Sequence, residues 1–239
     1  MKSYRNLGLW AFAAIAAVMI GADQAHAGNL LEKIIGIEAG AFGIVIQMTI
    51  ILTSMFMLGW SIECFVNVTR DKIIAPEVVA ALQGYVEEGD LEGALQYCEA
   101  APNPITRIVA APLSRMHSGW DSMKDAVEQQ IVVEEGKLIS HISPLSLVAA
   151  LGPMMGLFGT VSGMVGAFDK MAVAGDSMSP MLVAGSIGLA LMSTVMGLLV
   201  AIPGMVSFWF FSNRVTRITD EINMVTDEIM DTLRGYVEA

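Results

Sequence analysis

Three hydroxyl side chains lie deep inside stretches of sequence that are otherwise apolar. Thr160 falls in the charge-free stretch 142–168, and Ser193 and Thr194 fall in the charge-free stretch 177–213. A hydroxyl group donates one hydrogen bond and accepts others without carrying a permanent charge. Such groups can bind water or the protonatable side chain of a partner inside an apolar layer. These three residues are therefore the candidates for a polar path.

Each threonine also has a purely local alternative. A threonine in a helix can donate its hydroxyl proton to the carbonyl four residues earlier, which satisfies the group and implies no function. The sequence leaves both interpretations open for Thr160 and Thr194.

Ionisable residues are absent from the same apolar stretches. No Asp, Glu, Lys, Arg or His occurs in 39–62, 142–168 or 177–213. A carrier of protons or ions usually needs a titratable or charged group at membrane depth. If this chain serves proton flow, the titrating group must come from another polypeptide.

Other chemistry finds little support in the sequence. The Gly-rich nucleotide loop, HExxH and GxSxG motifs are absent, so we expect no enzymatic activity and no cofactor. His26, His117 and His141 are scattered, and Cys64 and Cys98 form no CxxC pair, so we expect no metal site and two free thiols. A net charge of -11 with only 13 Lys and Arg argues against nucleic-acid binding.

Small residues recur at helical spacing on both sides of the hydroxyls. Such stripes let helix backbones approach closely in a membrane, where lipid provides no hydrophobic force between helices. The first series is Gly152, Gly156, Gly159, Gly163 and Gly166, and the second is Ser186, Ala190, Thr194, Gly197, Ala201 and Gly204. Packing alone would explain both stripes, and a polar path between them is the functional alternative.

The elements that carry these residues are predicted to be membrane-spanning helices. The chain is 54% hydrophobic and 15% charged, which is far too apolar for a soluble domain of 239 residues. Helices over 39–62, 142–168 and 180–213 are each long enough to cross a bilayer. The predicted fold class is an all-α membrane protein with three transmembrane helices, whose long helices extend into a helical cytoplasmic domain.

Charge beside the spans predicts their orientation. Lys and Arg flank the inner ends of the three spans, at Arg70, Lys72, Lys137, Arg214 and Arg217. These flanks belong in the cytoplasm, and the short loop 169–179, with Lys170 as its one cation, belongs outside. We therefore expect a multi-pass protein of the bacterial inner membrane, with its N-terminus periplasmic and its C-terminus cytoplasmic.

Two polar segments are predicted to be helical. In 63–141, Asp90 is placed to cap a helix, and the apolar spacing in 120–139 predicts one helix that continues into the second span. In 214–239, apolar residues occupy one helical face and acidic residues the other. The acidic faces are typical of solvated surfaces, and a docking surface for a partner is the alternative.

The N-terminus has the layout of a secretory signal. Lys2 and Arg5 precede an apolar run, and Ala25-His26-Ala27 forms a small-x-small cleavage site. We expect a signal peptide at 1–27 and a periplasmic segment at 28–38. An uncleaved anchor is the alternative, although the apolar run is only about 14 residues and a span needs about 20.

The two glycine-rich spans resemble the MotA/TolQ/ExbB proton-channel family. Residues 151–164, LGPMMGLFGTVSGM, are similar to its LxPLLGLLGTVxGM motif, and residues 190–203, ALMSTVMGLLVAIP, are similar to ALxxTAxGLxxAIP. The resemblance extends over residues 39 to about 235 and is closest to the ExbB and TolQ type.

The resemblance implies an assembly and a task. In this family, five subunits enclose single-span partner helices of the ExbD or TolR type, each with an essential membrane Asp. Thr160 and Thr194 would line the central pore, and proton flow would drive work on TonB-like, TolA-like or other envelope proteins.

One departure from the family pattern lies near the second threonine. ExbB and TolQ commonly carry a Glu five residues before it, where this chain has Leu189 beside Gly188. This implies a pore lining that differs from theirs. The alternatives are a structural membrane oligomer, whose stripes serve assembly only, a self-sufficient channel, and a MotA-like flagellar stator subunit.

Overall fold

The computed structural model describes residues 40–174 and 180–237, and the predicted signal peptide, the segment 28–38 and part of the loop 169–179 lie outside these ranges. The described residues are almost entirely helical, and none of them lies in a β-strand. Within the described ranges, three helices are long and apolar enough to cross a membrane: α3 (Gly40–Asn67), α8 (Trp120–Ala174) and α9 (Pro180–Val237). The predicted all-α membrane fold with three long apolar helices is confirmed.

Two of these helices are much longer than a bilayer is thick. At about 1.5 Å per residue, α8 with 55 residues and α9 with 58 each extend over more than about 80 Å, against an apolar layer of about 30 Å. The predicted continuation of 120–139 into the second span as one helix is confirmed. Each long helix therefore has an apolar part that fits a membrane and a polar part that does not.

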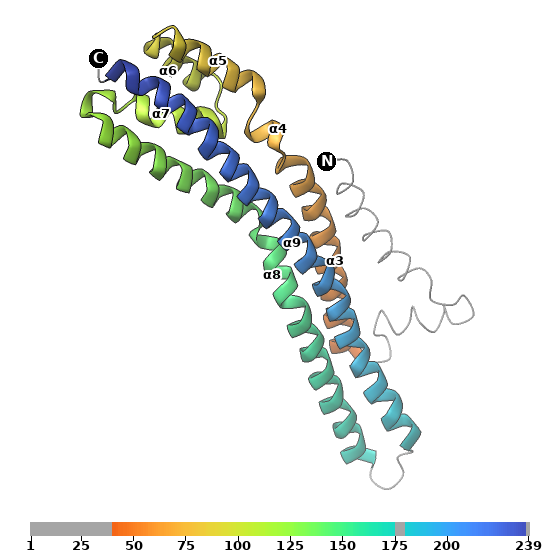
Figure 1. Cartoon of the computed structure of the whole chain (residues 1–239). Coiled ribbons are helices and arrows are strands. Elements are labelled where there is room, and N and C mark those ends of the chain that lie inside the picture. The colour runs from red at the N-terminus through yellow and green to blue at the C-terminus, as the bar shows by residue number, and fades with distance from the viewer. Residues whose placement is uncertain (1–39, 175–179, 238–239) are drawn as a thin grey trace. The chain divides into compact units, whose positions relative to one another are not determined.

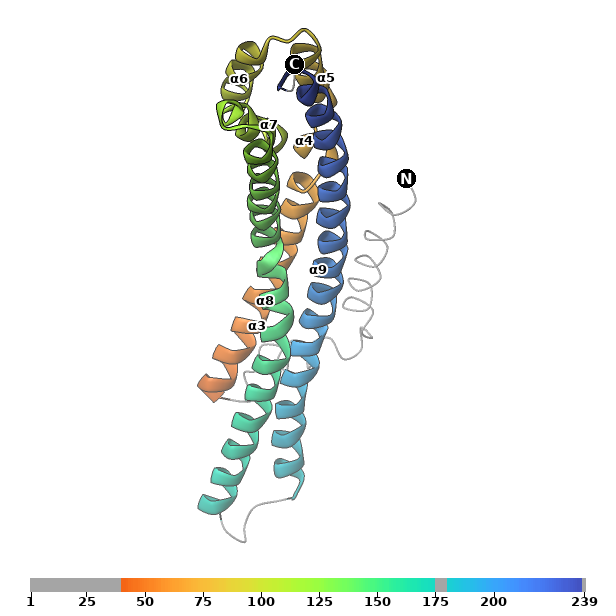
Figure 2. The ribbon, with the colours of Figure 1, turned by 60° about the vertical axis from the view of Figure 1, so that its left-hand side comes forward.

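The chain divides into two compact units. The first contains the apolar parts of the three long helices, in the described residues 40–59, 145–174 and 180–206. There α8 and α9 run side by side in opposite directions (Figures 1 and 2). Large side chains are mostly exposed in this unit, among them Leu157, Phe158, Leu191 and Ile202.

This exposure follows from how little three helices can cover. Only 22% of the most apolar window of α3 is buried, and 39% of the corresponding windows of α8 and α9. In water such a surface would be an aggregation liability, because folded soluble chains rarely expose large contiguous apolar patches. The apolar unit therefore needs lipid or other polypeptides around it.

The second unit contains residues 60–144 and 207–237, with the polar ends of the long helices. Its short helices are α4 (Arg70–Ile73), α5 (Pro76–Glu87), α6 (Leu91–Ala100), α7 (Pro104–Leu113) and the 3-10 turn η3 (Met116–Ser118). Proline begins α5 and α7, a position at which its missing N–H costs nothing. Asp90 caps α6 as predicted, because its carboxylate accepts a hydrogen bond of 2.9 Å from the Gly93 amide.

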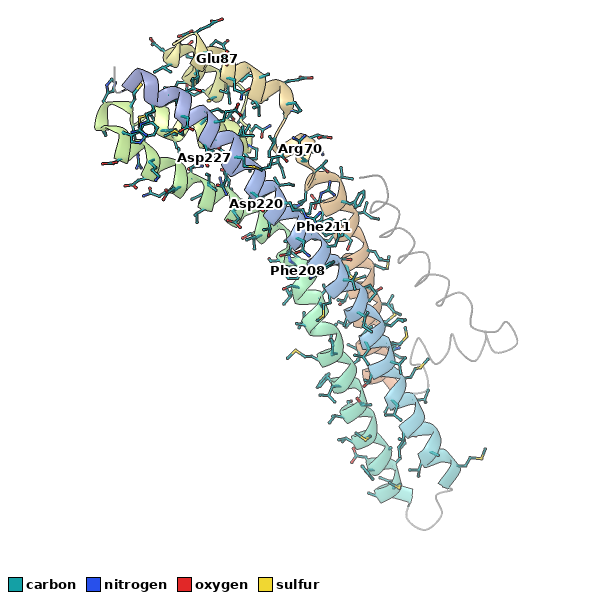
Figure 3. The ribbon with its side chains drawn as sticks, in the orientation of Figure 1. Arg70, Glu87, Phe208, Phe211, Asp220 and Asp227 are labelled. Atoms are coloured by element: carbon teal, nitrogen blue, oxygen red, sulfur yellow. The ribbon has the colours of Figure 1, made fainter. Side chains whose placement is uncertain are left out.

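The core of the second unit is built from aliphatic side chains of α5, α7, α8 and α9. The largest of those that are almost fully buried are Leu82, Ile105, Ile108, Met123, Ile142, Ile222, Ile229 and Leu233. The predicted apolar face of α9 is buried, whereas Asp220 and Asp227 are exposed along the same helix (Figure 3). Arg70 of α4 forms an ion pair with Glu221 of α9, its Nε lying 2.8 Å from both carboxylate oxygens.

Candidate functional site

The two stripes of small residues face each other between α8 and α9. A methyl group added at Gly163 would lie 2.5 Å from the Cβ of Ala190, and one at Gly156 would lie 2.9 Å from the Cα of Thr194. At the other end of the stripe, a methyl group at Gly152 would lie 2.7 Å from the carbonyl oxygen of Gly197 and 3.0 Å from the Cβ of Ala201. The two backbones are thus in direct contact over this whole stretch.

Thr160 and Thr194 meet at the centre of this contact. Their Oγ1 atoms are 2.9 Å apart, and both lie close to one backbone carbonyl, that of Gly156, at 3.0 Å and 3.1 Å. The Thr160 hydroxyl is also 2.9 Å from the carbonyl of Leu157. Thr160 therefore makes the local contact within its own helix and reaches across to α9 as well.

The two hydroxyls can form more than one arrangement of hydrogen bonds. The two hydroxyls hold two protons, and the acceptors available are two carbonyl oxygens and each other's oxygen atoms. One arrangement has Thr160 donating to Thr194, which donates to Gly156, and the reverse arrangement has Thr194 donating to Thr160. The hydroxyl pair can switch between these arrangements by rotating its O–H bonds, without gaining a charge.

The three predicted polar residues differ in how far they are covered. Thr160 is 5% exposed, whereas Thr194 and Ser193 are half-buried. Ser193 packs against Gly159, where an added methyl group would lie 2.8 Å from the Ser193 hydroxyl oxygen. Within one chain, Thr194 and Ser193 therefore offer the accessible side of the cluster and Thr160 its buried side. Ser186, the first residue of the α9 stripe, is half-buried.

Gln47 is a buried polar side chain of the apolar unit that was not predicted from the sequence. Gln47 of α3 is 3% exposed, and among the described residues its amide nitrogen has no hydrogen-bond partner. The neighbouring Ile46 lies close to the hydroxyl cluster, since a methyl group added at Gly159 would be 3.4 Å from its Cγ2. The available signal was that Gln47 is the only amide side chain in the charge-free stretch 39–62.

The surroundings of the cluster are neutral. The family's usual Glu is replaced by Leu189, which is half-buried, and Gly188 beside it is exposed. A buried hydroxyl pair can pass a hydrogen bond along, but it cannot hold an excess proton at ordinary pH. The site therefore supplies polar atoms and lacks an acid.

Residues 100–224 match the MotA/TolQ/ExbB proton channel family. This match covers just over half of the chain and includes both threonines. The chain belongs to this family.

Similar proteins of this family carry the name ExbB. The biopolymer transport protein ExbB of Xanthomonas campestris pv. campestris is 30% identical over 203 residues, which are 78% of this chain and 79% of that protein. An ExbB homolog of Methanothermobacter thermautotrophicus is 27% identical over 154 residues, which are 64% of this chain. That match spans only 54%, about half, of the Methanothermobacter protein.

A solved structure shares the fold. The structure of C. jejuni MotAB matches with a TM-score of 0.51 over 100% of this chain and 90% of the other, at 15% sequence identity. At that identity the likeness concerns the arrangement of helices alone. This MotA/TolQ/ExbB family member thus shares the helical fold of that structure.

Proposed function

We propose that several copies of this chain, most simply five, form a scaffold in the bacterial inner membrane around the single-span helices of a partner protein. The partner supplies a membrane Asp that takes up and releases protons. Thr160, Thr194 and Ser193 supply polar atoms along the proton path. The energy of proton flow then drives movement of the enclosed helices.

The observation that carries this proposal is a hydroxyl pair within charge-free helices. The Oγ1 atoms of Thr160 and Thr194 join α8 to α9 at 2.9 Å, and no ionisable residue occurs in 142–168 or 177–213. A proton-channel family member that lacks an acid in its own spans needs one from elsewhere. An Asp on a partner helix of the ExbD or TolR type meets that need, and half-buried Thr194 is accessible from outside the chain.

The apolar surface supports assembly. Most of the apolar window of each long helix is exposed in the single chain, although lipid can cover only the outside of an oligomer. Further copies of this chain and the partner's helices would cover the apolar surface that lipid does not reach. The N-terminus would lie in the periplasm and the C-terminus in the cytoplasm.

The task that we infer is force transfer to envelope proteins. The relatives named biopolymer transport protein ExbB support a TonB-like or TolA-like load over a flagellar rotor. Leu189 in place of the family's usual Glu makes the pore less polar near Thr194, which fits a load that differs from those of the typical ExbB and TolQ proteins.

A purely structural membrane oligomer is the second candidate. One observation favours it: Thr160 is already satisfied by carbonyls of its own helix. In that case the hydroxyls would serve only to pack α8 against α9.

Affinity purification of the full-length chain from its native membranes tests the proposal. We expect mass spectrometry of the purified complex to recover a small protein with a single membrane span and one Asp within that span. A chain that purifies only with itself, under conditions that preserve the oligomer, would leave the structural alternative in place and overturn the proposal.

A further inference from the structure

The boundary between the first span and the polar helices holds a cluster of metal-ligating side chains. Glu63 and Cys64 lie in the last two turns of α3, directly after the charge-free stretch 39–62. His141 lies in α8, directly before the second charge-free stretch. One ligand atom of each of the three residues lies within 4.8 Å of the other two.

We propose that Glu63, Cys64 and His141 form a binding site for a divalent transition-metal ion of the zinc class, which ties α3 to α8. A carboxylate, a thiolate and an imidazole are the three kinds of protein ligand that Zn²⁺ accepts. Because a soft thiolate is part of the set, the site favours zinc-class ions over Mg²⁺ or Ca²⁺.

The facing atoms of Glu63 and His141 point to a cation between them. Glu63 Oε2 and His141 Nε2 are 2.8 Å apart. Both atoms are shielded from solvent. Apart from this close approach, neither has a hydrogen-bond partner among the described residues. If His141 Nε2 carries a proton, the two atoms form a simple His–Glu pair. If it does not, both atoms are acceptors that repel each other at this distance, and a metal ion between them would remove the repulsion. The third candidate ligand is the Cys64 thiol, whose Sγ lies 4.0 Å from the backbone carbonyl oxygen of His141. Once it loses its proton, this sulfur would complete a set of three metal ligands.

The distances need only a small adjustment. Ligand atoms around a tetrahedral Zn²⁺ are separated by roughly 3.3 to 3.8 Å, given bond lengths of about 2.0 to 2.3 Å. The Glu63–His141 pair would open by a fraction of an ångström from 2.8 Å, and Cys64 would move inward from within 4.8 Å. Three protein ligands leave a fourth position for water.

The surroundings hold the ligands and leave an entrance. The indole Nε1 of Trp60 donates a hydrogen bond of 2.9 Å to the backbone carbonyl of His141, and the two rings are in contact with centroids 5.7 Å apart. Such outer contacts orient a ligating histidine. Cys64 is fully buried, whereas the side chains of Glu63 and His141 are each about one third exposed, so an ion can reach the site from solvent.

Binding releases the thiol proton. The ion replaces hydrogen on Cys64 Sγ, and the proton passes to solvent, so the affinity for the ion rises with pH. The site shares no residue with the hydroxyl cluster. Its presence or absence therefore leaves the proposed proton path untouched.

Titration of the purified full-length chain with Co²⁺ tests the site, because cobalt reports its ligands by absorption. We expect a thiolate-to-cobalt charge-transfer band that saturates at a single equivalent and is abolished by Zn²⁺, with no effect of Mg²⁺. Glu63→Gln and His141→Gln should weaken binding about tenfold or more. Cys64→Ser should remove the band.

Matched controls separate the site from general binding to an acidic protein. His117→Gln and Cys98→Ser change the same residue types elsewhere and should leave the band and the affinity as in wild type. A wild-type chain without a thiolate band, or equal affinities for the His141→Gln and His117→Gln variants, would overturn the proposal. The two glutamine variants keep the test decisive if Cys64→Ser fails to fold.

Discussion

At the scale of single residues, the hydroxyls of Thr160 and Thr194 contact each other across the two helices. Thr160 also contacts backbone carbonyls of its own helix. Both hydroxyl oxygens share the Gly156 carbonyl, so neither proton has one fixed acceptor. A hydroxyl pair with two alternative hydrogen-bond arrangements can accept a hydrogen bond from a partner's acid and respond by reversing the bond between the two hydroxyls. Structural packing alone would need only one arrangement.

We predict that Thr160→Val and Thr194→Val each abolish proton flux while the complex still assembles. Valine keeps the shape of threonine and removes the hydroxyl, so packing of α8 against α9 is preserved and the polar path is broken. Flux is measured with a pH-sensitive dye in vesicles that contain the purified complex. Thr160→Ser and Thr194→Ser retain the hydroxyl and should retain flux.

Thr49 and Thr53 of α3 provide the control. Their hydroxyls donate to the carbonyls of Val45 and Thr49, four residues earlier, at 2.8 Å each. Thr49→Val and Thr53→Val should leave proton flux unchanged. Normal flux in the Thr160→Val and Thr194→Val complexes would assign the hydroxyl pair to packing.

The polar part of α8 contains a buried carboxylate whose charge depends on its neighbours. Glu134 is 2% exposed, and Arg107 contacts its two oxygens at 2.8 Å and 2.9 Å. Lys137 adds a contact of 2.7 Å. Burial raises the pKa of Glu134, but the hydrogen bonds from Arg107 and Lys137 outweigh it and hold the pKa below its ordinary value of 4.5.

This lowered pKa predicts a pH dependence of stability. A carboxylate whose pKa is lower in the folded state stabilises the fold fully above the ordinary pKa, and that contribution is lost as the pH falls through the folded-state value. Glu134→Gln should lower the free energy of unfolding at pH 7 by about 1 to 3 kcal/mol, and its deficit should shrink below pH 4.5. Thermal unfolding at several pH values measures both effects.

Glu128→Gln is the matched change on the same helix. Glu128 pairs with Lys124 at 4.0 Å, and both side chains are mostly exposed. Solvent-exposed ion pairs contribute little to stability, so the free energy of unfolding of this variant should differ from that of wild type by less than about 1 kcal/mol at every pH. A deficit of Glu134→Gln that stays constant with pH would contradict the assigned charge state.

At the scale of elements, the contact between α8 and α9 depends on the absence of side chains. Gly156 and Gly163 each face backbone or Cβ atoms of α9 closer than a methyl group tolerates. Gly166 lies on the same helix, but a methyl group there would meet no atom of the described residues within 4 Å. The stripe is thus a steric requirement at some of its positions only.

We predict that Gly156→Ala destabilises the protein and Gly166→Ala does not. Alanine favours a helix by up to about 1 kcal/mol over glycine, but the methyl group at Gly156 would lie 2.9 Å from the Thr194 Cα and force the helices apart. Overpacking lowers the free energy of unfolding by about 1 to 3 kcal/mol, so at Gly156 the steric overlap outweighs the gain in helix propensity. Thermal unfolding of both variants in detergent gives the comparison, and equal melting temperatures would contradict the packing.

The long helices can be predicted from the sequence because the features that determine them lie within single continuous segments. Runs without charge set the spans, and apolar spacing in 120–139 sets the continuation of α8. The small-residue stripes also lie within single segments, although only the structure shows that Gly163 faces Ala190. Patterns with a short period are visible without knowing the partner surface.

The contacts that the sequence does not reveal join distant positions. Glu134 pairs with Arg107 at a separation of 27 residues, and His141 meets Glu63 and Cys64 from another helix. No periodicity encodes such meetings, because they depend on how whole helices pack. The histidines are far apart in the sequence, so nothing in the sequence indicated that His141 lies beside Glu63 and Cys64. The burial of Gln47 was also not predicted, because it depends on the helices that cover this residue.

At the scale of the whole molecule, the chain is a membrane protein whose proposed proton path needs an acid from elsewhere. It belongs to a proton-channel family, it has no ionisable residue in its three apolar stretches, and most of its apolar helix surface is uncovered. An acid from a partner and a shell of further copies would supply what the single chain lacks. The proposed mechanism thus resides in the assembly and not in any one subunit.

Proton flux into vesicles with and without the partner is the measurement that tests this claim most directly. The purified chain alone, reconstituted as an oligomer, should conduct no protons above empty vesicles. The complex with its copurified single-span partner should conduct, and replacing the partner's membrane Asp by Asn should stop the flux. Proton conduction by the chain alone, at the rate of the complex, would contradict the account.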